Sequence, residues 1–200
     1  MSAALDRFYL IVGDADRVEQ LVPLGVRLVQ LRIKDKSDVE IRAQIKVAQI
    51  VCTRHNAQLV VNDYWDIALD LGCDYVHLGQ EDLDNADTAA LRKAGMKLGI
   101  STHDEAELER ALSFSPDYVA LGPVYPTLLK KMPWAPQGLD KLTRWKQRIG
   151  DIPLVAIGGL MIERLDGVFG AGADSAAVVT DIQTAKNPEA RTRAWIAATR

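Results

Sequence analysis

Two cations and an amide alternate along one short apolar segment of the chain. In the stretch 26–34, Val-Arg-Leu-Val-Gln-Leu-Arg-Ile-Lys, single apolar residues separate Gln30, Arg32 and Lys34. Side chains two apart share one face of a β-strand, so this face turns from apolar to cationic along its length. Barrel enzymes place such groups at the carboxyl ends of their strands. The pattern predicts a site for an anionic ligand, and a surface strand with a basic end is the alternative.

Polar residues also follow other apolar segments. They form the clusters Asn62-Asp63, His77 to Asp82, Ser101-Thr102-His103 and Val179-Thr180. Asp63 and Asp82 follow neighbouring candidate strands, so their carboxylates can converge. Two hard oxygen ligands beside the oxygens of a diphosphate suit Mg²⁺. The alternative is that each aspartate only caps a helix.

Two glycines and one long loop complete the candidate site. Gly158-Gly159 opens a helical segment, where backbone N–H groups can approach a phosphate, or it forms only a tight turn. The stretch 123–138 is long for a barrel loop and predicts a lid, with an ordered surface excursion as the alternative. We expect His77 to be a packed interior histidine and His103 to be a first-turn residue.

Eight apolar runs alternate with eight helical patterns, which predicts a compact (β/α)₈ TIM barrel that occupies residues 1–200 as one domain. An open doubly wound sheet is the runner-up, but no G-x-G-x-x-G turn follows an early strand. Ser37 and Thr102 are plausible helix caps. The expected strands are 8–12, 26–32, 58–62, 75–78, 97–101, 118–121, 154–157 and 175–179. The expected helices are 16–24, 38–55, 65–71, 88–94, 105–114, 140–149, 162–171 and 189–199.

Composition narrows the class of protein. Apolar residues make up 48% of the 200 residues, enough for a sizeable core, and a net charge of −3 gives no basic surface for nucleic acid. Cys52 and Cys73 lack metal-binding spacing and are expected to be reduced packing residues. The chain shows neither a signal peptide nor a membrane-spanning run, so we expect a cytoplasmic protein.

The chain resembles the thiamine phosphate synthase (thiamine phosphate pyrophosphorylase) family from residue 9 to residue 182. The resemblance rests on six motifs in order. They are Gln-Leu-Arg-Ile-Lys at 30–34, Asn-Asp-Tyr-Trp-Asp at 62–66, Val-His-Leu-Gly-Gln-Glu-Asp at 76–82, Gly-Ile-Ser-Thr-His at 99–103, Gly-Pro-Val-Tyr-Pro-Thr at 122–127 and Ala-Ile-Gly-Gly at 156–159.

This resemblance implies a transferase that condenses hydroxymethyl aminopyrimidine diphosphate with hydroxyethyl methylthiazole phosphate, using Mg²⁺ and releasing pyrophosphate. It implies that Asp63 and Asp82 hold the metal. The implied pyrimidine diphosphate ligands are Gln30, Leu31, Arg32, Ile33, Lys34, Asn62, Ser101 and Lys130. The implied thiazole phosphate ligands are Thr127, Leu128, Leu129, Gly159, Val179 and Thr180. The implied catalytic residues are Arg32, Lys34, Ser101 and Lys130.

The sequence departs from the family pattern at two positions. Leu129 stands where the family has a second threonine, and Thr180 stands where it commonly has a serine. One alternative function is a thiazole tautomerase, which resembles the synthase and shares its phosphate end but would not need the paired aspartates and the cationic strand. The other is a degenerate synthase that only binds phosphorylated ligands, which the missing hydroxyl at Leu129 keeps open. The partners implied are small phosphorylated molecules, and the sequence is compatible with a homo-oligomer.

Overall fold

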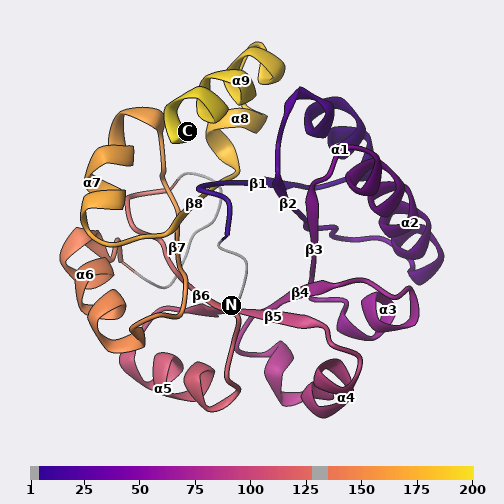
Figure 1. Ribbon diagram of the computed structural model, residues 1–200, viewed down its shortest axis with the longest axis horizontal. Coiled ribbons are helices and arrows are strands. Elements are labelled where there is room, and N and C mark those ends of the chain that lie inside the picture. Colours follow the sequence, from indigo (N-terminus) through magenta and orange to yellow (C-terminus); the bar gives the residue numbers. More distant parts are fainter. Residues whose placement is uncertain (1–4, 128–134) are drawn as a thin grey trace.

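A closed parallel β-barrel forms the centre of the molecule (Figure 1). The computed structural model describes residues 5–127 and 135–200. Within these residues the barrel has eight strands, each hydrogen-bonded to its sequence neighbours, and β1 closes the ring against β8. The strands are β1 (Phe8–Val12), β2 (Leu28–Leu31), β3 (Gln58–Asn62), β4 (Tyr75–Leu78), β5 (Lys97–Thr102), β6 (Tyr118–Leu121), β7 (Leu154–Ile157) and β8 (Ser175–Val178). The predicted single-domain (β/α)₈ fold is confirmed.

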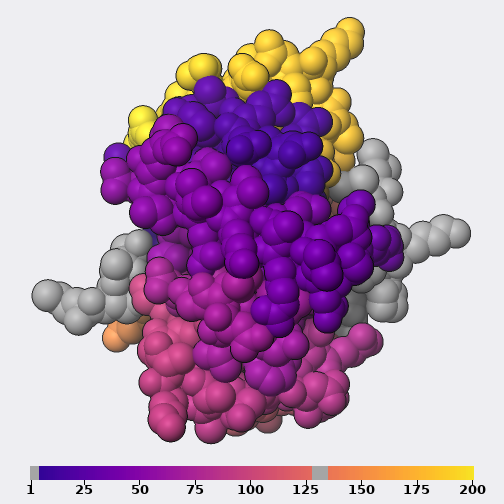
Figure 2. Space-filling view, turned by 90° about the vertical axis from the view of Figure 1, so that its right-hand side faces the viewer, coloured from indigo at the N-terminus to yellow at the C-terminus, as the bar shows by residue number. Residues whose placement is uncertain are grey.

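Helices surround the barrel. They are α1 (Ala15–Leu21), α2 (Asp38–Arg54), α3 (Trp65–Asp70), α4 (Thr88–Lys93), α5 (Glu105–Ser113), α6 (Gly138–Ile149), α7 (Leu165–Gly170), α8 (Thr180–Gln183) and α9 (Pro188–Thr199). Short 3₁₀ turns are η1 (Val22–Leu24), η2 (Asp82–Asp84) and η3 (Ile162–Arg164). The first half of the chain covers one flank, with the C-terminal residues beside α1 (Figure 2). Among the described helices, none is long and apolar enough to cross a membrane.

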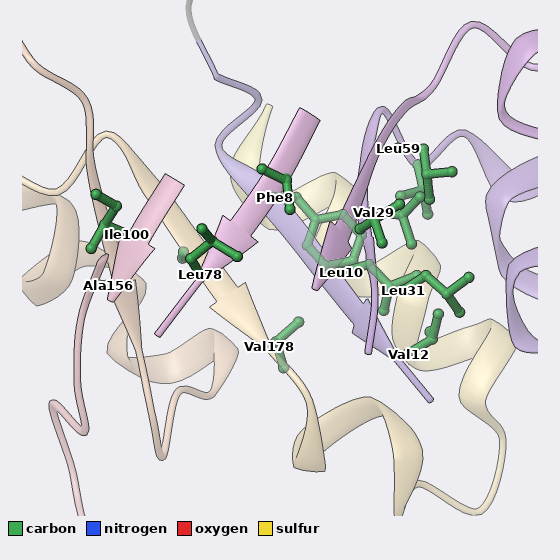
Figure 3. Close-up of a cluster of buried hydrophobic side chains, with 14 of the residues drawn as sticks. Phe8, Leu10, Val12, Val29, Leu31, Leu59, Leu78, Ile100, Ala156 and Val178 are labelled. Atoms are coloured by element: carbon green, nitrogen blue, oxygen red, sulfur yellow. The ribbon is translucent and has the colours of Figure 1, made fainter. Parts of the chain in front are cut away.

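The strands place alternate side chains in two separate apolar layers. In β6, Tyr118 and Ala120 point into the barrel, whereas Val119 and Leu121 pack outward against the helices. Figure 3 shows part of the outer layer, in which Leu31 belongs to the same buried cluster as side chains from neighbouring strands. The alternation of side chains along each strand therefore supplies both layers. It also determines which residues reach the mouth of the barrel.

Helix starts follow the expected capping chemistry in one case and differ in another. Ser37 caps α2 in a reciprocal capping box with Glu40, which typically contributes about 1 kcal/mol to helix stability. The predicted cap Thr102 is wrong, because Asp104 caps α5. Thr102 is buried at the end of β5, where its hydroxyl donates to the Ala120 carbonyl and accepts from the Trp145 indole.

Several element boundaries differ from the sequence prediction. The strand expected over 26–32 is shorter, although the Arg32 amide still donates to the Val12 carbonyl at 2.8 Å. The helix expected over 16–24 ends at Leu21 and continues as a 3₁₀ turn that contains Pro23, which has no N–H to donate. The helix expected over 162–171 is likewise divided, and the four-residue helix α8 was not predicted.

Candidate functional site

A cavity of about 1180 Å³ opens at the carboxyl ends of the strands. Its walls include most of the described residues that sequence analysis selected. These are Gln30, Arg32, Lys34, Asn62, Asp63, Asp82, Ser101, Thr127, Gly159, Val179 and Thr180. The opposite mouth holds a smaller cavity of about 470 Å³, which Arg27, Tyr75 and Lys97 help to line.

The end of β2 supplies the cationic wall. Gln30 is buried and donates from Nε2 to the Tyr9 hydroxyl at 3.0 Å, while Arg32 is half-buried and Lys34 is exposed. Among the described residues, no ion pair includes Arg32 or Lys34. Within the described residues these two cations make no direct ion pair, so they are available for an anionic ligand.

The structure does not bring the side chains of Leu31 and Ile33 to the cavity. Both are buried in the outer apolar layer, on the opposite face of the strand from Gln30 and Arg32. The Ile33 carbonyl accepts a hydrogen bond from the Tyr64 hydroxyl at 3.3 Å. These two residues therefore hold the strand in place, and a ligand contact from them would have to come from the backbone.

The two predicted metal ligands face each other across the ends of β3 and β4. Burial raises the pKa of the Asp63 carboxyl to about 6, and the charge of Asp82 adds to this effect. The nearby charges of Arg32 and Lys34 act in the opposite direction but do not cancel it. The two carboxylates repel each other when both are ionised. A hard divalent cation bound between them would offset this repulsion and use their oxygens as ligands.

Neither aspartate acts as the side-chain cap of a long helix. Asp63 has a left-handed backbone with φ 66°, and the residue that caps α3 is Tyr64, without a side-chain hydrogen bond. The Asp82 carboxylate accepts from the Gly79 amide at 2.9 Å within the turn after β4. Among the described residues, no group of three or more His, Cys, Asp or Glu side chains is arranged to hold a metal. Substrate oxygens and water would complete the coordination of Mg²⁺.

Two buried polar atoms beside the acidic pair lack a hydrogen-bond partner in the described part of the chain. The Asn62 Nδ2 donor and the Gln80 Oε1 acceptor are both buried and unbonded within the described part of the chain. Both residues line the cavity. Leaving a buried polar group without a hydrogen bond costs free energy. Their positions therefore favour a ligand that accepts a hydrogen bond from Asn62 and donates one to Gln80.

His77 lies between the cavity and the barrel interior. Its Nδ1 is 2.7 Å from the Tyr118 hydroxyl, and its Nε2 is 2.8 Å from the Ser101 hydroxyl. Burial, assisted by the charge of Arg32, lowers the pKa of His77 to about 4, so the imidazole is neutral at pH 7. The prediction of a packed interior histidine is confirmed, and the same ring also borders the cavity.

Backbone turns rather than charged side chains form the wall after β7 and β8. Gly158 and Gly159 have φ of 95° and 65°, in the left-handed region that favours glycine. A Cβ on Gly159 would lie 2.5 Å from the Pro126 carbonyl oxygen, so the loop after β6 packs directly on this turn. The Arg164 guanidinium donates to the Gly159 carbonyl and lies 4.4 Å from the Tyr125 ring. The short helix α8 begins nearby at Thr180, an arrangement that barrels often use for phosphate.

The loop after β6 contributes Thr127 to the cavity. The predicted contacts of Leu128, Leu129 and Lys130 lie outside the described residues. The prediction of a lid over 123–138 also falls partly on that segment. Its described ends are tied to each other, because the Gln137 amide donates to the Pro123 carbonyl at 2.7 Å.

Sequence analysis assigned no binding role to several residues that line the cavity, although Gln80 and His103 lie in polar clusters that it named. Tyr9 and Tyr118 reach it from inside the barrel, and Gln80 reaches it from the turn after β4. His103 and Glu107 also line it, as a pair joined at 2.8 Å. The alternation of β1 and β6 would have identified both tyrosines as inward-facing. No sequence signal gave the hydrogen bonds between them.

The fold and this cavity define a class, a (β/α)₈ barrel with a large cavity at the carboxyl ends of its strands. Comparison with known proteins gives the family. The family model described as thiamine monophosphate synthase matches residues 8–182. The chain belongs to this family.

Relatives agree with that assignment over nearly the whole chain. The sequence is 62% identical to thiamine-phosphate synthase of Rhizobium etli, across 98% of this chain and 96% of the relative. It is 47% identical to thiamine-phosphate synthase of Citrobacter koseri, across 90% of this chain and 85% of the relative. The activity of the family is that of a transferase, thiamine-phosphate synthesis, which favours the synthase prediction over the tautomerase alternative.

Solved structures give the same result. Thiamine phosphate pyrophosphorylase from Pyrococcus furiosus superposes with a TM-score of 0.85 at 26% identity, covering 96% of this chain and 95% of that one. A 3-hexulose-6-phosphate synthase superposes with a TM-score of 0.67 at 16% identity, covering 98% of this chain and all of the other. The second similarity shows only that the barrel is shared.

Proposed function

We propose that the cavity at the carboxyl ends of the strands is where the two substrates are joined. The pyrimidine diphosphate and the thiazole phosphate implied by the sequence resemblance would bind there together. The observation that carries this proposal is the juxtaposition of unpaired cations, Arg32 and Lys34, with the converging carboxylates of Asp63 and Asp82. A metal–diphosphate group needs both kinds of charge at one place.

The two anionic groups would occupy different walls. Gln30, Arg32, Lys34, Asn62 and Ser101 would hold the pyrimidine diphosphate at the ends of β2, β3 and β5. Gly159, Val179 and Thr180 would hold the thiazole phosphate through the turns after β7 and β8. Thr127 and Lys130 would contribute from the loop after β6, where the family motif places them.

Asp63 and Asp82 would hold Mg²⁺. When bound, the ion supplies Lewis-acid stabilisation of negative charge on the diphosphate oxygens. The raised pKa of Asp63 fits this role, since a cation would relieve the repulsion between the two carboxylates.

The chain's own residues would stabilise charge rather than form a covalent bond. The pyrimidine methylene carbon loses its bond to the diphosphate oxygen, which keeps the electron pair and leaves a pyrimidine-stabilised carbocation. The thiazole nitrogen lone pair then forms the new carbon–nitrogen bond. Arg32 and Lys34, with Lys130, would neutralise the departing pyrophosphate. No side-chain nucleophile is needed.

A turnover assay with both substrates and Mg²⁺ tests the proposal. Asp63→Ala and Asp82→Ala should each lower turnover roughly a hundredfold or more, the usual cost of one preorganised charge-stabilising group. Asp66→Ala is the matched control, because Asp66 is exposed on the first turn of α3 and does not line the cavity. Near-normal turnover of both cavity variants at low Mg²⁺ would overturn the metal assignment.

Three further features stay predictions. They are the extent of the domain over residues 1–200, a cytoplasmic location and a homo-oligomeric state. Gel filtration with light scattering would measure the last of these.

A further inference from the structure

Five buried or half-buried side chains form one continuous chain of hydrogen bonds inside the barrel. Each comes from a different strand. The links are Gln30 Nε2 to Tyr9 Oη at 3.0 Å, Tyr9 Oη to Tyr118 Oη at 3.0 Å, Tyr118 Oη to His77 Nδ1 at 2.7 Å, and His77 Nε2 to Ser101 Oγ at 2.8 Å. Both ends of this hydrogen-bond chain, Gln30 and Ser101, line the cavity.

Ring packing fixes the middle of this chain. The Tyr118 ring is stacked on His77 with centroids 5.5 Å apart, and it meets Tyr9 edge-on at 6.0 Å. Gly99 in β5 makes room for the ring, since a Cβ there would lie 2.1 Å from Tyr118 Cζ. The packing therefore restricts the position of the Tyr118 hydroxyl and the hydrogen-bond partners that it can reach.

The available hydrogen-bond donors set the direction in which hydrogens are donated along this series of hydrogen bonds. The Gln30 Nε2 amide can only donate, so the Tyr9 oxygen accepts from it. The Tyr9 hydroxyl hydrogen then goes to the Tyr118 oxygen, and the Tyr118 hydroxyl hydrogen goes to His77. In the reverse direction the Tyr9 oxygen would accept twice, and its own buried hydrogen would have no acceptor within this chain, which is unfavourable.

The direction decides the tautomer of His77. A neutral imidazole has one N–H and one lone pair. Because Nδ1 accepts from Tyr118, the hydrogen is on Nε2, and it is donated to the Ser101 oxygen. The hydrogen of the Ser101 hydroxyl is then left to point into the cavity.

We propose that this chain fixes Ser101 as a hydrogen-bond donor toward the bound ligand, with Tyr118 and His77 as the positioning residues that set its direction. The ligand atom that meets Ser101 is therefore an acceptor, such as a ring nitrogen or a phosphate oxygen. Naming the pyrimidine diphosphate as this ligand rests on the proposed function, whereas the direction of the chain does not.

Nitrogen-15 spectra of the histidine side chains test the direction without any substrate. The sequence has three histidines, so His77 can be assigned by replacing His55 and His103 one at a time. At pH 7.5 we expect the His77 ring to be the Nε2–H tautomer. An Nδ1–H tautomer, or an averaged mixture of the two, would overturn the proposal.

Two matched variants then test the positioning role. Tyr118→Phe keeps the ring but removes the donor to Nδ1, so the His77 tautomer should become mixed. The kcat/KM for the pyrimidine diphosphate should fall by about tenfold, as expected for one lost hydrogen bond, with the KM for the thiazole phosphate unchanged. Tyr75→Phe is the control, because Tyr75 also packs on Tyr118, with ring centroids 5.6 Å apart, but lines the opposite cavity.

The outcomes separate this inference from the proposed function. An Nε2–H tautomer in a protein that makes no thiamine phosphate would refute the proposed function and leave the direction of the chain intact. A mixed tautomer in Tyr118→Phe with unchanged kcat/KM would refute the positioning role. Equal changes in Tyr75→Phe and Tyr118→Phe would show a packing effect and also refute it.

Discussion

The two walls of the cavity differ in the groups that they present to a ligand. On the β2–β5 wall, charged and amide side chains stand at the strand ends, and Asp63 and Asp82 are held together against their mutual repulsion. On the β7–β8 wall, Gly158 and Gly159 offer backbone in left-handed conformations. One wall depends on side-chain charge, and the other depends on backbone shape.

This difference predicts different responses to mutation. We expect the loss of Arg32 or Lys34, which lie at the rim of the charged wall, to affect ligand binding and turnover more than folding. The glycine turn has no side chain to remove, and any added atom meets the loop after β6. Changes there should affect binding and stability together.

The largest expected effect on the backbone wall comes from Gly159→Ala. The new Cβ would meet the Pro126 carbonyl oxygen, and alanine is strained at φ 65°. Strain of about 1–3 kcal/mol would lower kcat/KM for the thiazole phosphate by roughly tenfold to a hundredfold and would also lower Tm. Steady-state kinetics and thermal unfolding would measure both.

Gly170→Ala in α7 is the matched control for this change. A Cβ there would meet nothing within 4 Å, and its φ is not in the left-handed region. Wild-type behaviour of Gly159→Ala would mean that the turn tolerates a side chain and does not need close backbone approach.

A smaller effect is expected from Leu129→Thr. The family motif places a hydroxyl at this position, which lies outside the described residues. At the low end of its range, a hydrogen bond to a charged phosphate oxygen is worth about 1.5 kcal/mol, so kcat/KM for the thiazole phosphate should rise by up to roughly tenfold. A loss of activity would show that the family threonine is not a transferable ligand here.

The smallest effect is a shift in stability from Asp63→Asn. The pKa of Asp63 is about 6 in the folded protein, above its ordinary value, so the fold loses stability as pH rises from about 4 to about 6 and stays less stable above that. Without Mg²⁺ at pH 7.5, the variant should gain roughly 2–4 °C in Tm, which corresponds to about 1 kcal/mol at this chain length.

The gain should disappear at pH 4, where the wild-type carboxyl is protonated. Mg²⁺ should raise the Tm of the wild type more than that of the variant, because ligand binding stabilises the folded state. A less stable Asn variant at pH 7.5 would contradict the account of the charged wall.

Residue patterns were sufficient to predict the barrel. Apolar runs such as 118–121 and 154–157 are bounded by polar residues and glycine, and their number and spacing leave few other topologies. Patterns were weaker at element ends. Thr102 resembles a helix cap in sequence, but the partners that hold it in β5, Ala120 and Trp145, are distant along the chain.

The site was predicted unevenly for the same reason. Alternation along β2 placed Gln30, Arg32 and Lys34 on the cavity side. Leu31 and Ile33 were included because the family motif is contiguous, whereas a strand presents only every second side chain to one face. The hydrogen bond between Tyr9 and Tyr118 joins residues 109 positions apart, and no local pattern reveals such a contact.

The central claim is that the two walls bind different anions. Calorimetric titration of each substrate alone into Arg32→Ala tests it, with Arg27→Ala as the control, because Arg27 lines the opposite mouth. We predict that Arg32→Ala weakens binding of the pyrimidine diphosphate by roughly tenfold to a hundredfold, the value of a charged hydrogen bond, and leaves thiazole phosphate binding within about twofold. Equal weakening of both substrates would contradict the division of the cavity into two walls.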